Sequence, residues 1–465
     1  MYPESSSAMP FAAVNPATGE EVRSFPSLAP EQALDAASRA GEAHLEWRTV
    51  PLDQRARMLR HAAGILREEA PRWARLMAEE MGKPVAQGES EAEKCAWVLE
   101  YYADHGADFL ADRPAEGVEG ARAYWSYQPL GVVLAIMPWN FPFWQVFRAA
   151  APTLMAGNAV LLKHAPGVPG CARACAEILH RAGIPEKLFQ NLFLEVEDVE
   201  TLLDHPAVRA ATLTGSVGAG KSVAALAGAR VKKCVLELGG SDPYVVLSDA
   251  DLELALERSL TSRLINTGQS CISAKRLIVV DEHHEAFLER VVERFSSVKA
   301  ANPFSRDAEM GPMARTELRD GLHQQVWHSV EAGARLHVGG QVPAGPGAWY
   351  PATVLSDVGP GMPAYHEELF GPVAVVIRAR DDEDAVRIAN DTDFGLGAAV
   401  FTRDVVRGEA LARDHMEAGA VFVNDFVRSD PRLPFGGIKE SGMGRELSPL
   451  GILEFVNVKT VWVAT

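Results

Sequence analysis

The chain has 465 residues, of which 47% are hydrophobic and 23% are charged, and its formal net charge is -17. This length exceeds what one hydrophobic core serves, so we expect two or three domains. The acidic balance disfavours nucleic acid and acidic lipid as partners, and no apolar run approaches the roughly 20 residues of a membrane span. We therefore expect a small-molecule substrate, no nucleic acid and no membrane.

The first 20 residues lack a basic segment followed by an apolar one, which speaks against secretion and favours a cytoplasmic location. The five cysteines are scattered, so no disulfide framework is expected. Cys171 and Cys175 lie one helical turn apart, but no nearby His or Cys pair completes four ligands. Helix packing is therefore the favoured role for both, and no metal site is expected.

Apolar residues three and four apart predict helices from about Pro30 to Leu110. The next segment, ARAYWSYQPLGVVLAIMP, passes from alternating residues to a continuous apolar, β-branched run. This change predicts an exposed strand followed by a buried one.

Helices and strands then alternate from 150 to 238, with predicted strands at AVLLK, FQNLFL, RAATLTG and KKCVLEL. Short connections favour parallel strands with crossover helices, and hence a doubly wound, Rossmann-like sheet. A second α/β region begins near GGSDPYVVL and ends in the glycine-rich LPFGGIKESGMGRE. The final NVKTVWVA alternates like a strand without an obvious home sheet.

Residues Gly215 to Ser222 match the phosphate-binding pattern G-x-x-x-x-G-K-[ST], between a predicted strand and a predicted helix. The same turn suits any cofactor with a pyrophosphate, because the amides at a helix N-terminus accommodate anions. A hydroxyl directly after the first glycine counts against an ATPase. A thiol, a carboxylate and an amide elsewhere in the chain count further against phosphoryl transfer. A P-loop nucleotidase is therefore only a distant alternative.

Three polar residues stand where chemistry is expected. Cys271 follows a polar turn, NTGQSC, which is an unusual setting for a buried cysteine. Glu237 ends a buried β-run, where ligands of parallel sheets gather, and Asn140 lies between two prolines in PWNFP. Each alone also fits a structural role. Together they supply the nucleophile, the general base and the amide donor that aldehyde oxidation through a thioester requires.

The segments PWNFP, LTGSVGAG, LELGG, NTGQSC, EELFGPV and PFGGIKESGMGRE occur in the order and spacing of the NAD(P)-dependent aldehyde dehydrogenase superfamily. The chain resembles this family over nearly its whole length, and most of all its bacterial succinate-semialdehyde dehydrogenase branch with KHAP. The resemblance implies an α/β fold with a Rossmann-like dinucleotide-binding domain (1–115 and 131–238), a catalytic domain (239–440) and a small β oligomerisation element (116–130 and 441–465). It also implies a homodimer or homotetramer.

The resemblance implies that Cys271 attacks the aldehyde carbon, that Asn140 and the Cys271 N–H hold the oxyanion, and that Glu237 activates the water that releases the acid. It implies NAD or NADP as cofactor. The implied cofactor-binding residues are Met137, Pro138, Trp139, Lys163, Pro166, Gly215, Ser216, Leu238, Glu368 and Phe370. Pro166 replaces the glutamate of most NAD-preferring members, so we expect NADP to be tolerated.

Arg148 stands where the semialdehyde dehydrogenases place an arginine, and its guanidinium would offer a fork for the substrate carboxylate. Pairing with an acid is the alternative. Ile265 stands where some succinate-semialdehyde enzymes carry a second arginine. Arg428 and Ser429 lie where the family lines its substrate entrance. The expected reaction is oxidation of succinate semialdehyde to succinate, with glutarate semialdehyde or a small uncharged aldehyde as alternatives.

Overall fold

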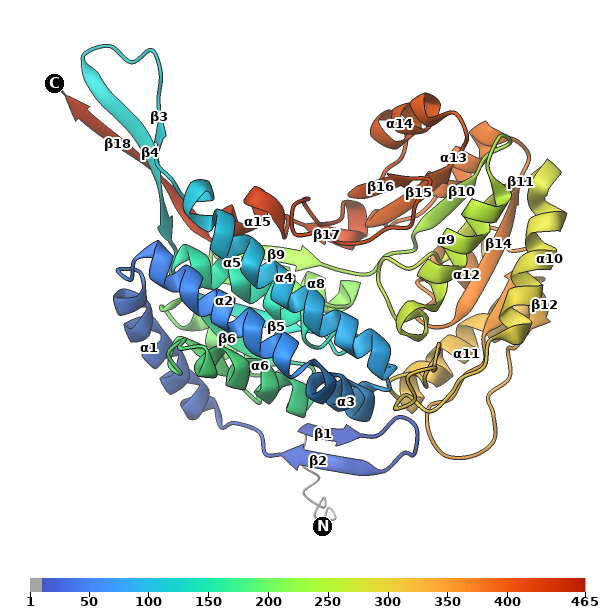
Figure 1. The fold of residues 1–465 in the computed structure, drawn as a ribbon, viewed down its shortest axis with the longest axis horizontal. Helices are drawn as coiled ribbons and strands as arrows, with labels where there is room; N and C mark the ends of the chain where they lie inside the picture. Colours follow the sequence, from blue (N-terminus) through green and yellow to red (C-terminus); the bar gives the residue numbers. More distant parts are fainter. Residues whose placement is uncertain (1–10, 465) are drawn as a thin grey trace.

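The computed structural model describes residues 11–464. Two α/β bodies lie beside each other, and a ribbon of long strands extends away from the first (Figure 1). The first body begins with a hairpin of β1 and β2, followed by four helices. Their bounds are β1 Phe11–Val14, β2 Glu21–Phe25, α1 Pro30–Trp47, α2 Leu52–Glu68, α3 Ala70–Met81 and α4 Val85–Phe109.

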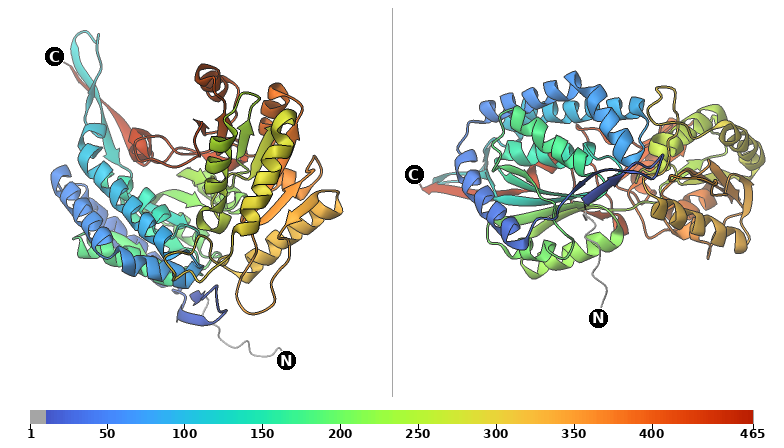
Figure 2. Two further views of the ribbon diagram at one scale, coloured as in Figure 1. Left: turned by 45° about the vertical axis from the view of Figure 1, so that its right-hand side comes forward. Right: turned by 90° about the horizontal axis from the view of Figure 1, so that it is seen from below.

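The sheet of the first body has the order β17-β9-β8-β5-β6-β7, and its strands are parallel except for β17. Helices α2 and α4 lie on one side of this sheet and α8 lies on the other (Figure 2). The predicted doubly wound sheet is confirmed. The elements are β5 Val132–Met137, α5 Trp144–Ala156, β6 Ala159–His164, α6 Pro169–Arg181, β7 Phe189–Asn191, α7 Val199–Asp204, β8 Val208–Thr214, α8 Val217–Ala229, β9 Lys233–Glu237 and β17 Gly442–Met443.

The second body contains a seven-stranded sheet with the order β12-β13-β14-β11-β10-β15-β16. Its strands are parallel except for the edge strand β12. The elements are β10 Pro243–Val246, α9 Leu252–Leu264, η1 Ile265–Gly268, β11 Arg276–Val280, α10 Asp281–Ser297, α11 Thr316–Glu331, β12 Arg335–Val338, β13 Thr353–Ser356, α12 Pro363–His366, β14 Val373–Ala379, α13 Asp382–Asn390, β15 Gly397–Phe401, α14 Val405–Asp414, β16 Ala420–Val423 and η2 Lys439–Ser441.

The final strand finds its partner in the ribbon. After α15 (Ser448–Leu453), β18 (Val456–Ala464) pairs antiparallel along the whole of β4 (Ala121–Pro129), and β3 (Arg113–Pro114) pairs with the other edge of β4. Trp462 and Val458 on β18 are exposed. The ribbon therefore presents apolar side chains to its surroundings, and the outer edge of β18 pairs with no other strand within residues 11–464.

Burial on both faces explains why the central strands are continuously apolar. Four of the six residues of β5 are buried in succession, Val132 to Ala135, as expected for a parallel strand covered by helices on each side. The Leu134 side chain is fully buried, and truncation to alanine would cost about 2–5 kcal/mol. No helix within residues 11–464 combines the length and the apolar character that a membrane crossing needs. The domain boundaries given above stay a prediction, and residues 1–10 and 465 lie outside the described residues.

Candidate active site

Cys271 lines a cavity of about 290 Å³ at the junction of the two bodies. Helices α4 and α5 of the first body form one side, and the loop that follows η1 in the second body contributes the cysteine. The lining residues are Gln87, Ser90, Glu91, Lys94, Phe141, Trp144, Gln145, Arg148, Ile265, Ser270, Cys271, Ile272, Ser429 and Phe435.

The backbone just before the cysteine adopts an unusual conformation. Asn266, Thr267 and Gly268 all have left-handed dihedrals, with φ of 56°, 58° and 73°. Such a conformation costs roughly 1–3 kcal/mol for each residue other than glycine, so the surroundings must hold it. Asn266 Nδ2 donates to the Asn140 carbonyl at 2.7 Å, and Thr267 Oγ1 accepts from the Gly311 N–H at 3.1 Å. These bonds fix the turn that aims Cys271 into the cavity.

Arg263 is a positioning residue that the sequence reasoning missed. Its guanidinium is fully buried and donates to the carbonyls of Gly268, at 2.7 Å, and of Gly371. Burial lowers the pKa of Arg263 to about 9. Nothing in the local sequence of α9 distinguishes this arginine from a surface one, because its partners lie in other segments.

The Cys271 thiol is half-buried in a region that disfavours its ionised form. Burial raises the pKa of Cys271 to about 12, although the positive charges of Lys275 and Arg148 oppose the rise. Lys275 Nζ donates to the Cys271 carbonyl at 2.6 Å and forms an ion pair with Glu368 at 3.2 Å. The thiol is therefore protonated at neutral pH in this arrangement, and attack needs added positive charge or a base nearby.

Asn140 follows β5 and lies close to the cysteine loop. Its Nδ2 donates to the Gln269 carbonyl at 3.2 Å, and the side chain is only 4% exposed. An amide nitrogen has two N–H groups, so one remains for a substrate oxygen. The position next to the turn that carries Cys271 suits the predicted oxyanion role.

Glu237 ends β9 and is 2% exposed, and neither carboxylate oxygen has a hydrogen-bond partner within residues 11–464. Burial raises the pKa of Glu237 well above its ordinary value; Glu446 adds to the rise and Arg148 opposes it. Gly436, in the PFGG segment, provides the space that the Glu237 carboxylate occupies. A Cβ at this position would lie 2.8 Å from Glu237 Oε1. A buried carboxylate without partners is costly, which makes Glu237 a candidate for chemistry.

Arg148, predicted to bind the substrate carboxylate, lines the cavity but is already paired. Its guanidinium forms an ion pair with buried Glu446, donates to Thr214 Oγ1 at 3.2 Å, and lies 4.8 Å from the Phe435 ring centroid. The exposed fraction of Arg148 is 1%. The guanidinium is therefore held by the protein itself, and its role toward a substrate stays a prediction.

Of the two other predicted substrate residues, only one lines the cavity. Ser429 lines the cavity, whereas Arg428 is exposed, pairs with Asp425 at 2.7 Å and does not line the cavity. Ser429 accepts a hydrogen bond from Lys94 Nζ at 2.7 Å. Lys94 is a second residue that the sequence reasoning missed. A lysine in a helical segment is usually exposed to solvent, and the local sequence of α4 gives no sign that this one lines a cavity.

The segment that matches the phosphate-binding pattern is helical from an early point. Helix α8 begins at Val217, and Ser216 caps it by accepting from the Ala219 N–H at 3.3 Å. Gly218 and Gly220 therefore lie inside the helix, and Lys221 pairs with Glu440 at 2.6 Å on the surface. A P-loop needs an open glycine turn before its lysine, so this geometry does not fit one. What remains is a helix N-terminus of the kind that accommodates anions.

The predicted cofactor residues lie at or just after the ends of β5, β6, β8 and β9 and in the loop before β14. Lys163 is 6% exposed, and burial lowers its pKa while Glu195 and Glu197 oppose the change. The Trp139 and Phe370 rings meet edge to face with centroids 5.8 Å apart. Of the others, Met137 ends β5, Gly215 follows β8, Leu238 follows β9, and Pro166 is exposed after β6. The buried amine of Lys163, the N-terminus of α8 and the aromatic pair of Trp139 and Phe370 are groups of the kind that bind a dinucleotide, and their role stays a prediction.

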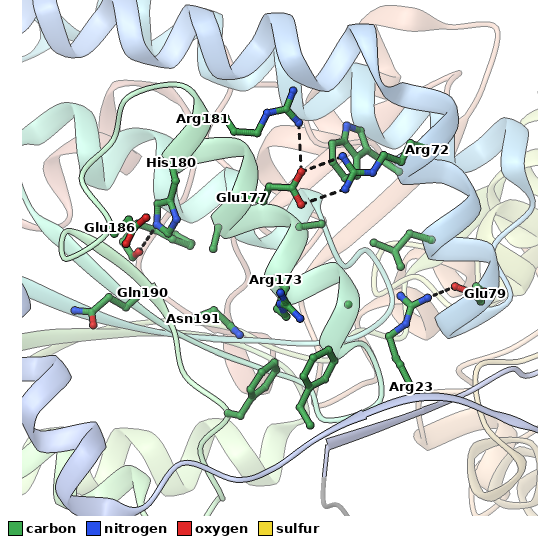
Figure 3. Close-up of a pocket in the computed structure, with 18 of the residues that line it drawn as sticks. Arg23, Arg72, Glu79, Arg173, Glu177, His180, Arg181, Glu186, Gln190 and Asn191 are labelled. Carbon is green, nitrogen blue, oxygen red and sulfur yellow. Dashed lines mark hydrogen bonds and ion pairs between the residues drawn. The ribbon is translucent and has the colours of Figure 1, made fainter.

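A second cavity, of about 1430 Å³, lies between the β1–β2 hairpin, α3 and α6 (Figure 3). Six of its lining residues are arginines, and several of these pair with acids, such as Arg72 with Glu177 and Arg23 with Glu79. None of the predicted site residues lines it. Cys271, Arg148 and Ser429, three of the predicted site residues, line the smaller cavity instead.

Comparisons with known proteins place the chain in a family. The chain is 47% identical over 456 residues to a probable succinate-semialdehyde dehydrogenase [NADP(+)] of Synechocystis sp. (98% of this chain, 100% of that protein), and 45% identical to the Escherichia coli succinate semialdehyde dehydrogenase [NAD(P)+] Sad (97% of each). The succinic semialdehyde dehydrogenase of Streptococcus pyogenes, solved with NADP+, has a TM-score of 0.95 at 34% identity (98% of this chain, 100% of that one). Lactaldehyde dehydrogenase from Escherichia coli has a TM-score of 0.94 at 33% identity (98% and 95%). Residues 2–461 match the aldehyde dehydrogenase family, and the chain belongs to it.

Proposed function

We propose that the protein oxidises succinate semialdehyde to succinate with NAD+ or NADP+ as the hydride acceptor. The observation that carries the proposal is the placement of the Cys271 thiol in a cavity that also holds the basic side chains Lys94 and Arg148. The carboxylate of Glu237 is buried and has no hydrogen-bond partner within residues 11–464. Arg148 links the two, because its charge acts on both Cys271 and Glu237. The names of the relatives support this substrate.

In the proposed reaction the Cys271 thiol loses its proton to solvent water, and the resulting thiolate sulfur forms a bond to the aldehyde carbon. The carbonyl oxygen becomes an alkoxide, and the free N–H of Asn140 Nδ2 and the Cys271 N–H stabilise it. Bound NAD(P)+ would accept the hydride from this carbon, which leaves the acyl group on sulfur as a thioester.

Glu237 acts in the second half of the reaction. Its carboxylate removes a proton from water as the water oxygen attacks the thioester carbon, the C–S bond breaks, and the thiolate is restored. A raised pKa makes an ionised carboxylate a stronger base, so the burial of Glu237 favours this role.

The cofactor would lie across the end of the first sheet, with its pyrophosphate at the α8 N-terminus and its adenosine ribose near Lys163. Pro166 stands exposed at the edge of this region and carries no charge to repel a 2′-phosphate. The similar succinate-semialdehyde dehydrogenases include one named for NADP(+) and one named for NAD(P)+. We therefore propose that both dinucleotides serve.

Two copies or four would assemble through the ribbon of β18 and β4, whose unpaired strand edge and exposed Trp462 and Val458 favour a second copy of the chain. Deleting residues 456–464 is expected to give a monomer in light scattering, where the full chain gives a dimer or tetramer. The five cysteines are all free, which is compatible with the reducing cytoplasm as the proposed location.

The test of the function compares succinate semialdehyde, glutarate semialdehyde and butanal with NAD+ and NADP+ in the wild-type protein and in Cys271→Ser. We expect the highest kcat/KM for succinate semialdehyde, and a loss on the order of 10³-fold or more in Cys271→Ser. Unchanged turnover in Cys271→Ser would refute the covalent mechanism. A wild-type protein that prefers butanal would refute the substrate assignment alone.

A further inference from the structure

The cavity that holds Cys271 contains one cation that no acid neutralises. Lys94 of α4 forms no ion pair within residues 11–464, whereas Arg148 is paired with Glu446. The acid in the cavity lining, Glu91, does not neutralise Lys94, because it is bound by other groups. It pairs with Lys83 and accepts from the N–H groups of Phe143 and Trp144 at 2.9 Å each. The positive charge available to a ligand is therefore that of Lys94.

The amine of Lys94 is held in place but keeps donors free. Its Nζ donates to Ser429 Oγ at 2.7 Å and lies 4.5 Å from the centroid of the Trp144 ring. An ammonium group has three N–H donors, and Ser429 uses one of them. The Ser429 hydroxyl accepts this bond and so can donate its own hydrogen to another oxygen. Together the two side chains form a donor pair that suits a carboxylate.

Among residues 11–464, the cavity has no second arginine that would compete with Lys94 for a carboxylate. Ile265 lines the cavity at the position of the second arginine of some succinate-semialdehyde enzymes, and it is apolar. Arg428 points its guanidinium to Asp425 outside the lining. A carboxylated substrate that enters this cavity therefore meets Lys94 as its free cationic partner.

We propose that Lys94 and Ser429 bind the carboxylate of the substrate while its aldehyde carbon meets Cys271, so that Lys94 sets the preference for carboxylated aldehydes. This inference rests on the proposed function and adds to it the residue that recognises the substrate. Hydrogen bonds to a charged group are among the stronger ones in proteins, and the partly enclosed cavity reduces screening by water.

The protonation of Lys94 gives the proposal a pH signature. Burial lowers the pKa of Lys94 to about 8; Arg148 of α5 adds to the fall, while Cys95 and Glu91 of α4 and Asp430 of the loop after β16 oppose it. The amine is charged below this pH and neutral above it. The preference for a carboxylated over an uncharged aldehyde should therefore decline as the pH rises above about 8.

The experiment measures kcat and KM for succinate semialdehyde and for butanal in the wild type, Lys94→Met and Ser429→Ala, with Lys299→Met as control. Lys299 is an exposed lysine that does not line the cavity. For Lys94→Met we expect kcat/KM for succinate semialdehyde to fall about 10- to 100-fold, mainly through KM, and kcat/KM for butanal to stay within about threefold. Ser429→Ala should shift the same ratio less, and Lys299→Met should not shift it.

The ratio of the two kcat/KM values, followed from pH 6.5 to 9.5, should fall above about pH 8 in the wild type and stay flat in Lys94→Met. A wild-type ratio retained in Lys94→Met would overturn the inference, and so would an equal loss on both aldehydes in a variant that melts like the wild type. A wild type without any preference for succinate semialdehyde would refute the proposed function itself, and this outcome is visible before any variant is made.

Discussion

Arg148 and Glu446 form a buried ion pair between α5 and the segment just before α15, within the charge field of the predicted base Glu237. The exposed fractions of the two side chains are 2% and 7%. The Arg148 guanidinium acts as a positive charge on the Cys271 thiol and on Glu237. Because Glu446 already binds this guanidinium, it is not available to pair with a substrate carboxylate. The sequence predicts that Arg148 binds the substrate carboxylate, with pairing to an acid as the alternative. In the structure Arg148 is paired with an acid, and its charge acts on the thiol and on Glu237.

Replacing Arg148 with alanine should therefore affect both kinds of substrate. The substitution leaves Glu446 buried without its partner, which costs about 3–5 kcal/mol of stability. We expect a lower melting temperature and similar losses of kcat/KM on succinate semialdehyde and butanal. The double variant Arg148→Met, Glu446→Leu should melt higher than Arg148→Ala, because it leaves no unpaired charge. If Arg148→Ala lost turnover of succinate semialdehyde and kept that of butanal, Arg148 would be the carboxylate fork that the sequence predicts.

The substitution Glu237→Gln should stop the reaction after the thioester forms. Hydride transfer does not need the base, so each active site should release one equivalent of reduced nicotinamide in a rapid phase. The following steady state should be slower than in the wild type by about 10²- to 10⁴-fold. Stopped-flow absorbance measures both phases, and mass spectrometry should find the acyl group on Cys271. Loss of the rapid phase in a folded variant would mean that Glu237 acts before the thioester.

Alkylation of Cys271 by iodoacetamide, without cofactor, should accelerate with pH. Burial raises the pKa of this thiol to about 12, so the reactive thiolate is a small fraction that grows about tenfold per pH unit between pH 7 and 10. We expect no plateau in this range, with modification assigned by peptide mass spectrometry. Cys271→Ser serves as the control for reaction at half-buried Cys234. A plateau near pH 8 would show that the thiol is already activated in the free enzyme.

Pro166→Glu should turn the protein away from NADP. A carboxylate at this exposed position would face the 2′-phosphate, and like charges placed together weaken binding. We expect the ratio of kcat/KM with NADP+ to that with NAD+ to fall roughly 10- to 100-fold. The uncharged variant Pro166→Gln is the matched control and should leave the ratio within about threefold. An unchanged ratio in Pro166→Glu would place the 2′-phosphate away from this residue.

The sequence by itself determines the architecture and the chemical groups. Continuous apolar runs such as β5 require burial on both faces, and they predict the parallel sheet that the structure contains. The family motifs predict Cys271, Glu237 and Asn140 as the reacting set. The structure brings Cys271 and Asn140 to one loop region and buries Glu237 without a partner. Membership in the aldehyde dehydrogenase family, inferred from these motifs, is confirmed.

Only the tertiary structure decides which charges are free. Lys94 meets Ser429 across 335 residues of chain, and Arg148 meets Glu446 through the docking of the segment before α15. The strand β18 likewise pairs with β4 and does not join either large sheet. A local pattern reports which side chains a segment carries and which face it buries. It does not report which remote group arrives within 3 Å, because that distance depends on how whole sheets and helices pack against one another.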